Sequence, residues 1–321
     1  MAGVPRRLIL DTDGGVDDAQ ALLLLIAAGR VPDAITTVFG NVELDAATDN
    51  VLATLAVAGV EVPVHAGAAD PLAAERIHAR EVHGDDGLAG APRPARTATA
   101  ASRDGVGFLV DTFRTAAAAG EPVDLLTIGP LTNLALALQR APDIVAGIGA
   151  LTVMGGTLHG RGNVTPAAEF NVFADPEAAA IVFATAMATT VVPWETCLAH
   201  RLDGATIDRL FAPVPDGPYR RFVAALLSNE RERHERHGMG DVFLFIDPLA
   251  AAVAIEPGLV ARSLRASVDV SLAPGVARGL TVVDPSGRLG TPPVTLVEDA
   301  RDDRLAALFA ASLAGPERFR G

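Results

Sequence analysis

Short apolar runs alternate with longer Ala- and Leu-rich segments along most of the 321-residue sequence. This alternation is typical of βα units around a mainly parallel sheet. The predicted strands are Arg7–Thr12, Ala34–Gly40, Val62–Ala66, Val123–Ile128, Gly149–Met154 and Thr189–Pro193. The predicted helices are Asp17–Ala28, Asp45–Ala58, Gly105–Ala119, Leu131–Arg140 and Pro176–Thr185. The sequence therefore predicts an α/β fold with an open, mainly parallel (mixed) central sheet flanked by helices.

Two polar, charged stretches, Asp70–Arg103 and Arg231–Phe245, interrupt the pattern. Each is predicted as a loop, either a functional lid or a poorly ordered connection. After Pro257 the sequence changes to strand-like pieces and a final helical segment. A chain of this length with 50% hydrophobic residues can bury one large core. We predict a single domain over residues 1–321, with a core of 7–255 on which residues 256–321 pack.

The net charge of −13 argues against nucleic-acid or anionic-membrane partners, which require clustered basic side chains. All 26 basic residues are Arg, because the sequence contains no Lys. The single cysteine, Cys197, cannot form an internal disulfide, and no sustained apolar segment precedes the first charges. No apolar run approaches the roughly 20 residues that span a bilayer. These features predict a cytoplasmic protein.

The stretch LDTDGGVDDAQ places four carboxylates, Asp11, Asp13, Asp17 and Asp18, between a predicted strand and a predicted helix. The turn can bring all four to the carboxyl end of the sheet, where ligands of open α/β folds bind. Carboxylates this close together need either raised pKa values or a bound divalent cation. Oxygen ligands in this number favour Ca²⁺ over Mg²⁺. Alternatively, Asp17 and Asp18 only cap a helix while the other two are solvated.

The same Asp-x-Asp-Gly motif also resembles the opening of the haloacid-dehalogenase-like phosphatases, whose first Asp is a nucleophile. That family normally has a basic residue, most often Lys, at its phosphate site. Neither the absence of Lys nor the Asp17-Asp18 doublet fits this alternative.

Further polar groups follow other predicted strands and could complete a site. They are Asn41, a backbone carbonyl in the IGPLTN motif, Asn163, Glu169, Asn171 and Asp247. Each alone could be a helix cap or a turn residue.

The motifs LDTDGGVDDA, FGN, IGPLTNLALAL, MGG, GNVTPAAEFNVFADPEAA and DPLA together resemble the inosine–uridine-preferring nucleoside hydrolases, in the same order and at similar spacing. The resemblance extends from the first strand to about Ile255. It implies the Rossmann-like nucleoside hydrolase fold and Ca²⁺-dependent hydrolysis of the N-glycosidic bond of ribonucleosides, giving ribose and a free base. It also implies a role in purine or pyrimidine salvage and a homodimer or homotetramer.

The resemblance assigns roles to residues of this sequence by position. The implied metal ligands are Asp13, Asp18, Asp247 and the main-chain oxygen of Ile128. The implied substrate-binding residues are Asp17, Asn41, Met154, Asn163, Glu169 and Asn171, with His83 closing over the site. Asp11 would support the metal site.

The chemistry fits these residue types. Cleavage of a ribosyl C–N bond passes through an oxocarbenium-like state, which anionic surroundings stabilise. Asp13, beside both the ion and the attacking water, is the candidate general base. Carboxyl and amide groups around the diol favour ribose over 2′-deoxyribose.

Two positions depart from the family pattern. Gly14 replaces the usual proline, and we expect it to adopt the same turn. Ile246 replaces the His that precedes the final Asp-Pro, and isoleucine cannot protonate the leaving base. The candidates for activating the base are His234, His237, Phe243, Phe245 and Trp194. A solvated helix end is the alternative for the two histidines, and core packing is the alternative for the two phenylalanines. His65, His78, His159 and His200 are predicted to be structural or surface residues. The loss of His also leaves open a nucleoside- or ribose-binding protein without turnover.

Overall fold

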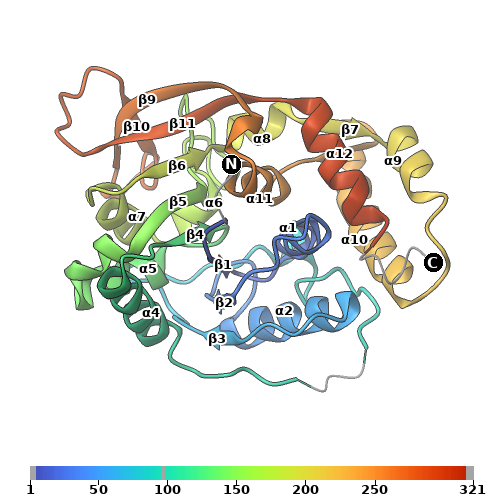
Figure 1. Cartoon of the computed structure of the whole chain (residues 1–321). Coiled ribbons are helices and arrows are strands. Elements are labelled where there is room, and N and C mark those ends of the chain that lie inside the picture. Colours follow the sequence, from blue (N-terminus) through green and yellow to red (C-terminus); the bar gives the residue numbers. More distant parts are fainter. Residues whose placement is uncertain (1–4, 95–97, 316–321) are drawn as a thin grey trace.

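The computed structural model describes residues 5–94 and 98–315. Within them, nine strands form one sheet in the order β10-β9-β11-β6-β5-β4-β1-β2-β3 (Figure 1). The strands are β1 (Leu8–Thr12), β2 (Ala34–Thr37), β3 (Val64–Ala66), β4 (Val123–Thr127), β5 (Ile148–Met154), β6 (Thr189–Val192), β9 (Val260–Val270), β10 (Thr281–Asp284) and β11 (Pro293–Ala300). β9 alone runs in the direction opposite to the other eight strands. The predicted mixed, mainly parallel sheet is confirmed.

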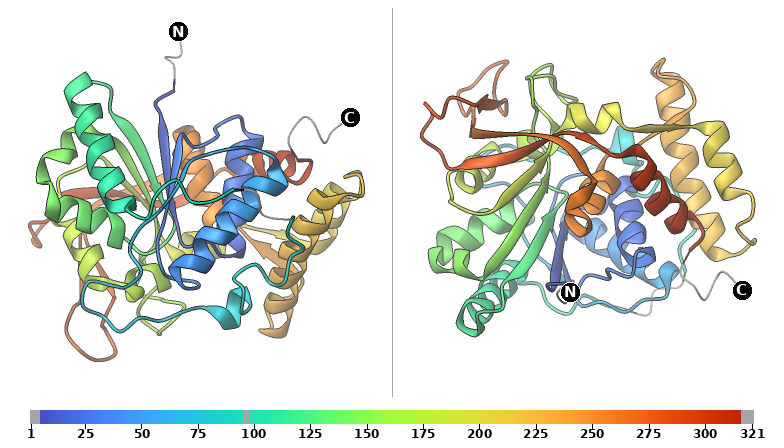
Figure 2. Two further views of the ribbon diagram at one scale, coloured as in Figure 1. Left: turned by 90° about the horizontal axis from the view of Figure 1, so that it is seen from below. Right: turned by 45° about the horizontal axis from the view of Figure 1, so that its top comes forward.

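Helices cover both faces of the sheet (Figure 2). They are α1 (Val16–Ala27), α2 (Leu44–Ala58), α3 (Arg80–His83), α4 (Gly105–Ala119), α5 (Thr132–Arg140), α6 (Phe170–Ala174), α7 (Pro176–Phe183), α8 (Trp194–Ala199), α9 (Gly204–Phe211), α10 (Pro218–Arg236), α11 (Asp247–Ile255) and α12 (Asp302–Leu313). Alternate side chains of β1 enter opposite cores, Leu8 and Leu10 with α1 and α11, and Ile9 with α4 and α5. The central strands are therefore buried on both faces.

The predicted strands and helices occur within a few residues of their predicted ends. The largest overrun is Ala34–Gly40, because β2 ends at Thr37 and the chain then turns into the site. The strands after Pro257 extend the same sheet, since β11 pairs in parallel with β6.

The prediction of a loop over Arg231–Phe245 is wrong. The 19-residue helix α10 runs to Arg236, and β8 (Val242–Leu244) pairs with β7 (Arg201–Asp203). The helix buries one face through Tyr219, Phe222, Val223, Leu226, Leu227, Glu230 and His234. Buried residues spaced three and four apart are typical of an amphipathic helix. The second half of α10 is so rich in charged residues that this spacing is hard to detect in the sequence. In the other predicted loop, Asp70–Arg103, the described residues contain one helical turn, α3, and residues 95–97 lie outside the described residues.

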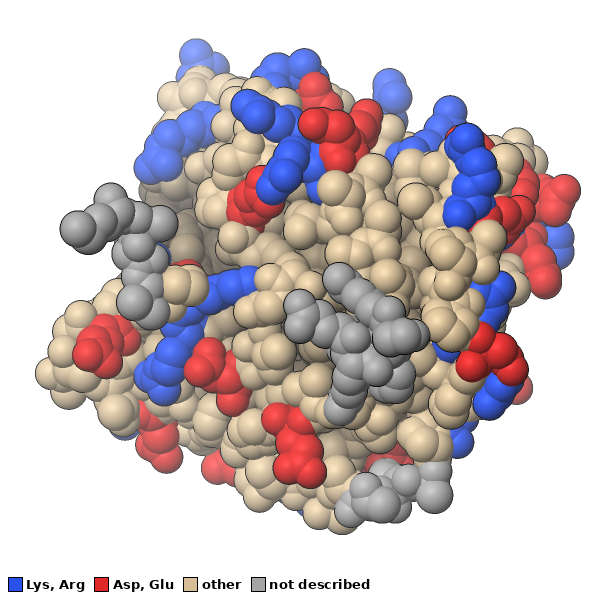
Figure 3. Space-filling model, turned by 45° about the vertical axis from the view of Figure 1, so that its right-hand side comes forward, with Lys and Arg blue, Asp and Glu red and all other residues tan. Residues whose placement is uncertain are grey.

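Acidic and basic side chains intermingle on the face shown in Figure 3. None of the described helices is long and apolar enough to cross a membrane.

Candidate active site

A pocket of about 650 Å³ opens beside the carboxyl ends of the central strands. Nine of the residues that the sequence analysis assigns to the metal or the substrate line it: Asp17, Asn41, His83, Ile128, Met154, Asn163, Glu169, Asn171 and Asp247. Most of them follow β1, β2, β4 and β5 or begin helices at the same end of the sheet, and His83 ends the short helix α3. Asp13 and Asp18 are buried beside these residues rather than lining the pocket.

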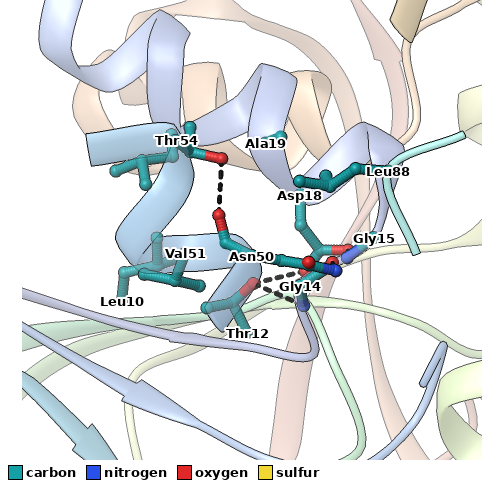
Figure 4. A pocket seen from close by; sticks show the side chains of 11 residues that line it. Leu10, Thr12, Gly14, Gly15, Asp18, Ala19, Asn50, Val51, Thr54 and Leu88 are labelled. Carbon is teal, nitrogen blue, oxygen red and sulfur yellow. Dashed lines mark hydrogen bonds between the residues drawn. The ribbon is translucent and has the colours of Figure 1, made fainter. Parts of the chain in front are cut away.

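The turn between β1 and α1 is fixed by neighbouring polar groups (Figure 4). Asp18 accepts hydrogen bonds from the Thr12 hydroxyl and, at 2.8 Å, from the Gly15 backbone. Asn50 of α2 donates to the Gly14 carbonyl at 2.7 Å. Gly14 has φ of +68°, whereas proline is restricted to about −65°. Proline cannot adopt this backbone conformation. The expectation that Gly14 adopts the same turn as the proline of the family pattern is therefore wrong.

Asp13 is fully buried and oriented by one residue from the next strand end. Its two carboxylate oxygens accept from the Asn41 backbone N–H at 2.8 Å and from the Asn41 side-chain amide at 3.0 Å. Asn41 also donates to Asp18 at 3.0 Å, so it joins the two carboxylates. Burial, followed by the charge of Asp18, raises the pKa of Asp13 well above its usual value. An added Cβ on Gly40 would lie 2.0 Å from the Asp13 carboxylate, so the close approach requires glycine.

Three further carboxylates meet beside Asp13. One oxygen each of Asp17, Asp18 and Asp247 lie within 4.8 Å of one another, and all three residues are buried. The pKa of each is raised, first by burial and then, for Asp18 and Asp247, by the charge of Asp17. Oδ1 of Asp17 is buried without a hydrogen-bond partner among the described residues. Buried oxygen ligands with uncompensated charge fit a hard divalent cation.

Asp11 does not join this group, which corrects the expectation that the four acids of the motif converge. Its carboxylate accepts from the Thr36 hydroxyl and from the Asn133 amide at 2.7 Å. Asn133 also donates to the Thr37 carbonyl at 3.0 Å and accepts from the Ala68 N–H at 2.7 Å. Burial raises the pKa of Asp11 to about 7. The fourth carboxylate of the group, beside those of Asp13, Asp17 and Asp18, comes instead from Asp247 at the start of α11.

Glu169 and Asn171 also line the pocket. Glu169 caps α6 by accepting from the backbone N–H groups of Asn171 and Val172 at 2.8 and 3.2 Å, and burial raises its pKa to about 7. The Asn171 amide donates to the main-chain oxygens of Ile128 and Met154, both at 3.2 Å. The Ile128 carbonyl is thus oriented toward the site by a side chain that also faces the pocket.

His83 of α3 is buried over the first turn of α1. Its Nδ1 accepts a hydrogen bond from the Val16 N–H at 3.1 Å, so the proton of the neutral ring is on Nε2. Burial lowers the pKa of His83 to about 4. Nδ1 also lies 3.7 Å from Asp17, but a neutral ring makes no ion pair there.

The structure separates the residues proposed to activate the base. Of these, Trp194 and His237 line the pocket. Phe243 and Phe245 pack against Phe309 in the core, so the alternative of core packing holds for both.

His234 does not line the pocket. Neither do the four histidines predicted to be structural or surface residues, His65, His78, His159 and His200.

Helix α10 contributes pocket residues that the sequence prediction missed. They are Asn229, Glu230, Arg233 and Arg236. The apolar period over the first half of α10 was the signal that would have extended the helix into the charged stretch and placed these side chains on one face.

An α/β sheet with buried carboxylates and amides around one pocket is typical of enzymes that act on small polar molecules. The family model described as "Inosine-uridine preferring nucleoside hydrolase" matches residues 8–307. The pyrimidine-specific ribonucleoside hydrolase RihA of Enterobacter sp. (strain 638) is 35% identical, over 96% of this chain and 97% of that protein. The probable uridine nucleosidase 1 of Oryza sativa subsp. japonica is 36% identical, over 78% and 77%.

Solved structures of nucleoside hydrolases are also similar to this chain. A plant nucleoside hydrolase, PpNRh1, superimposes with a TM-score of 0.88 at 29% identity, over 98% of this chain and 100% of that one. A purine-preferring ribonucleoside hydrolase from Gardnerella vaginalis gives a TM-score of 0.88 at 27% identity, over 97% and 98%. The chain belongs to the inosine–uridine-preferring nucleoside hydrolase family, so it is a hydrolase of ribonucleosides. The phosphatase and binding-protein alternatives gain no support.

Proposed function

We propose that this protein hydrolyses the N-glycosidic bond of ribonucleosides to ribose and free base in a Ca²⁺-dependent reaction. The observation that carries the metal dependence is the convergence of the buried side chains of Asp17, Asp18 and Asp247, with one oxygen of each within 4.8 Å of the others. Asp13, Asp18, Asp247 and the Ile128 carbonyl would hold the ion. When bound, Ca²⁺ would lower the pKa of a coordinated water and order the ribose diol.

The protein's own residues supply the remaining chemistry. Asp13 is held by Asn41 in one orientation and would accept the proton of the attacking water. Breaking the C1′–N bond leaves positive charge on the sugar, and the surrounding carboxylates stabilise it. Glu169, fixed by backbone N–H groups, adds to this anionic wall.

The ribose would be recognised by groups that already face the pocket. Asp17, Asn41, Glu169 and Asn171 would bind the hydroxyls, and the other contacts would come from Asn163 on the 5′ side, Met154 and His83. Because these polar groups are buried, a substrate without the 2′-hydroxyl would leave some of them unpaired. This supports a preference for ribonucleosides over 2′-deoxyribonucleosides.

Further parts of the proposal concern the protein's setting. We propose a single-domain cytoplasmic enzyme of nucleoside salvage, acting as a homodimer or homotetramer without nucleic-acid or membrane partners. The net charge of −13 supports the exclusion of polyanionic partners.

The test of the base is Asp13→Ala, with the exposed Asp143→Ala as the matched control. Asp13→Ala should reduce kcat by about three orders of magnitude, whereas Asp143→Ala should retain wild-type activity. Unchanged turnover in folded Asp13→Ala would refute the assignment.

Calorimetric titration with Ca²⁺ tests the metal ligands. Asp18→Asn and Asp247→Asn should each weaken binding at least tenfold. Asp17→Asn distinguishes a sugar contact, which raises KM at saturating Ca²⁺, from a metal ligand, which weakens Ca²⁺ binding itself.

A further inference from the structure

Helix α10 presents charged side chains to the pocket. Glu230 and Arg233 lie one helical turn apart, and both line the pocket. Glu230 is 3% exposed; the Gln20 amide of α1 lies beside it, but neither Glu230 carboxylate oxygen meets hydrogen-bond geometry with any of the described residues. Nε of Arg233 is also buried without a partner. Buried polar atoms normally have partners, so both side chains are expected to meet a polar ligand.

The orientation of Arg233 is fixed by the next residue along the helix. Nδ1 of His234 lies 2.9 Å from the Val242 carbonyl, which can only accept, so Nδ1 carries the proton. Nε2 of His234 therefore accepts from Arg233 Nη2, 2.9 Å away. His234 is itself buried and is anchored to β8 by this contact. The guanidinium is thus held by a rigid neutral ring rather than by an acid.

Arg233 also keeps its positive charge available to the pocket. No Asp or Glu of the described residues lies within ion-pair distance of it, unlike Arg231 of the same helix, which pairs with Asp208 and Asp241. The pocket therefore combines the carboxylates of Asp17 and Asp247 with the guanidinium of Arg233 on α10, which makes no ion pair among the described residues.

We propose that Arg233, positioned by His234, donates a hydrogen bond to the departing nucleobase, and that Glu230 binds a polar edge group of the same base. This inference rests on the proposed function. As the C1′–N bond breaks, its electron pair passes to the base, whose ring nitrogens and oxygens gain negative charge. The oxygen of water forms the new bond to C1′ and its proton goes to Asp13. Arg233 keeps its proton, and the base anion is protonated afterwards by water.

This role accounts for the isoleucine at position 246. A guanidinium donor can stabilise an anionic leaving group without proton transfer, so the histidine missing at Ile246 is not needed. His237 also reaches the pocket, but it lies exposed with Nδ1 on the Arg233 carbonyl at 2.7 Å.

The experiment compares two kinds of substrate: inosine and uridine, whose bases need stabilisation, and 4-nitrophenyl ribofuranoside, whose leaving group does not. Arg233→Gln should lower kcat on the nucleosides by about 100- to 1000-fold and change the nitrophenyl rate less than about threefold. Arg221→Gln is the matched control, because Arg221 lies on α10, pairs with the exposed Asp216 and does not line the pocket.

His234→Gln tests positioning: it should show the same substrate selectivity with a smaller loss. If Arg233→Gln does not fold, Arg233→Lys, which retains the charge but lacks the planar fork, should show a selective loss of about tenfold. Equal losses on both kinds of substrate, or no loss, would overturn the role of Arg233. A wild-type enzyme that cleaves neither kind would overturn the proposed function itself, and this inference with it.

Discussion

Replacing Asn133 by Ala tests whether the buried polar network behind the pocket stabilises the fold. The side chain makes three hydrogen bonds, to Asp11, the Thr37 carbonyl and the Ala68 N–H, at 2.7, 3.0 and 2.7 Å. Each orphaned buried group costs about 1 to 3 kcal/mol. Because the Asp11 carboxylate keeps its hydrogen bond from the Thr36 hydroxyl, we expect a total loss in the lower part of this range, about 3 to 5 kcal/mol in the free energy of unfolding.

The assay is urea unfolding followed by circular dichroism, with a thermal scan beside it. At about 2.1 cal/mol/K per residue, the unfolding entropy of 321 residues is about 0.7 kcal/mol/K. A loss of about 4 kcal/mol then lowers Tm by about 6 °C. Asn229→Ala is the matched control, since the Asn229 amide makes one hydrogen bond, to the Val82 carbonyl at 3.0 Å, and should cost about 1 kcal/mol. A loss in Asn133→Ala no larger than in this control would refute the reasoning.

Three further perturbations probe the site and its support. Gly40→Ala should lower kcat at least about 100-fold because its Cβ displaces Asp13, whereas Gly258→Ala, with open space around it, should have no effect; equal activities would contradict the close approach. Phe243→Ala should cost about 3 to 5 kcal/mol of stability with little change in KM for nucleosides. A raised KM without destabilisation would instead support the hypothesis that Phe243 stacks on the base. Burial lowers the folded-state pKa of His234 to about 4, so below its usual value of 6.5 the unfolded chain binds a proton that the native state excludes. Between about pH 7 and about pH 4.5 the stability advantage of wild type over His234→Asn in urea unfolding should therefore shrink by about 2 kcal/mol, and a constant difference would be inconsistent with a neutral ring.

The sequence predicts the parts of the site that follow from local pattern. Asp13 and Asn41 follow apolar strands, and the carboxyl ends of parallel strands share one edge, so their meeting could be expected. Asp11 could not be placed this way, because its partner Asn133 lies 122 positions away on α5. Which strand-end acids meet in space depends on such long-range hydrogen bonds.

Helix α10 shows the other limit. Its first half carries the apolar spacing of a helix, but the stretch SNERERHERHG after it has charges on nearly all sides, as a solvated loop would. Tertiary contacts bury Glu230 and His234 in spite of this pattern, and α10 packs against α1 and α2. Polar side chains such as these are buried where a functional site requires them, not where local propensity favours it. The periodicity of the sequence alone therefore does not predict their burial.

The most direct test of the central claim is release of reducing sugar from inosine, adenosine, guanosine, uridine and cytidine. Both purines and pyrimidines belong in the panel, because relatives include a pyrimidine-specific and a purine-preferring hydrolase. The assay is run on untreated enzyme, after EDTA treatment, and after Ca²⁺ is restored. We predict ribose release that is lost with EDTA and recovered with Ca²⁺. Release unaffected by EDTA would contradict the metal dependence, and no release from any nucleoside would contradict the hydrolase.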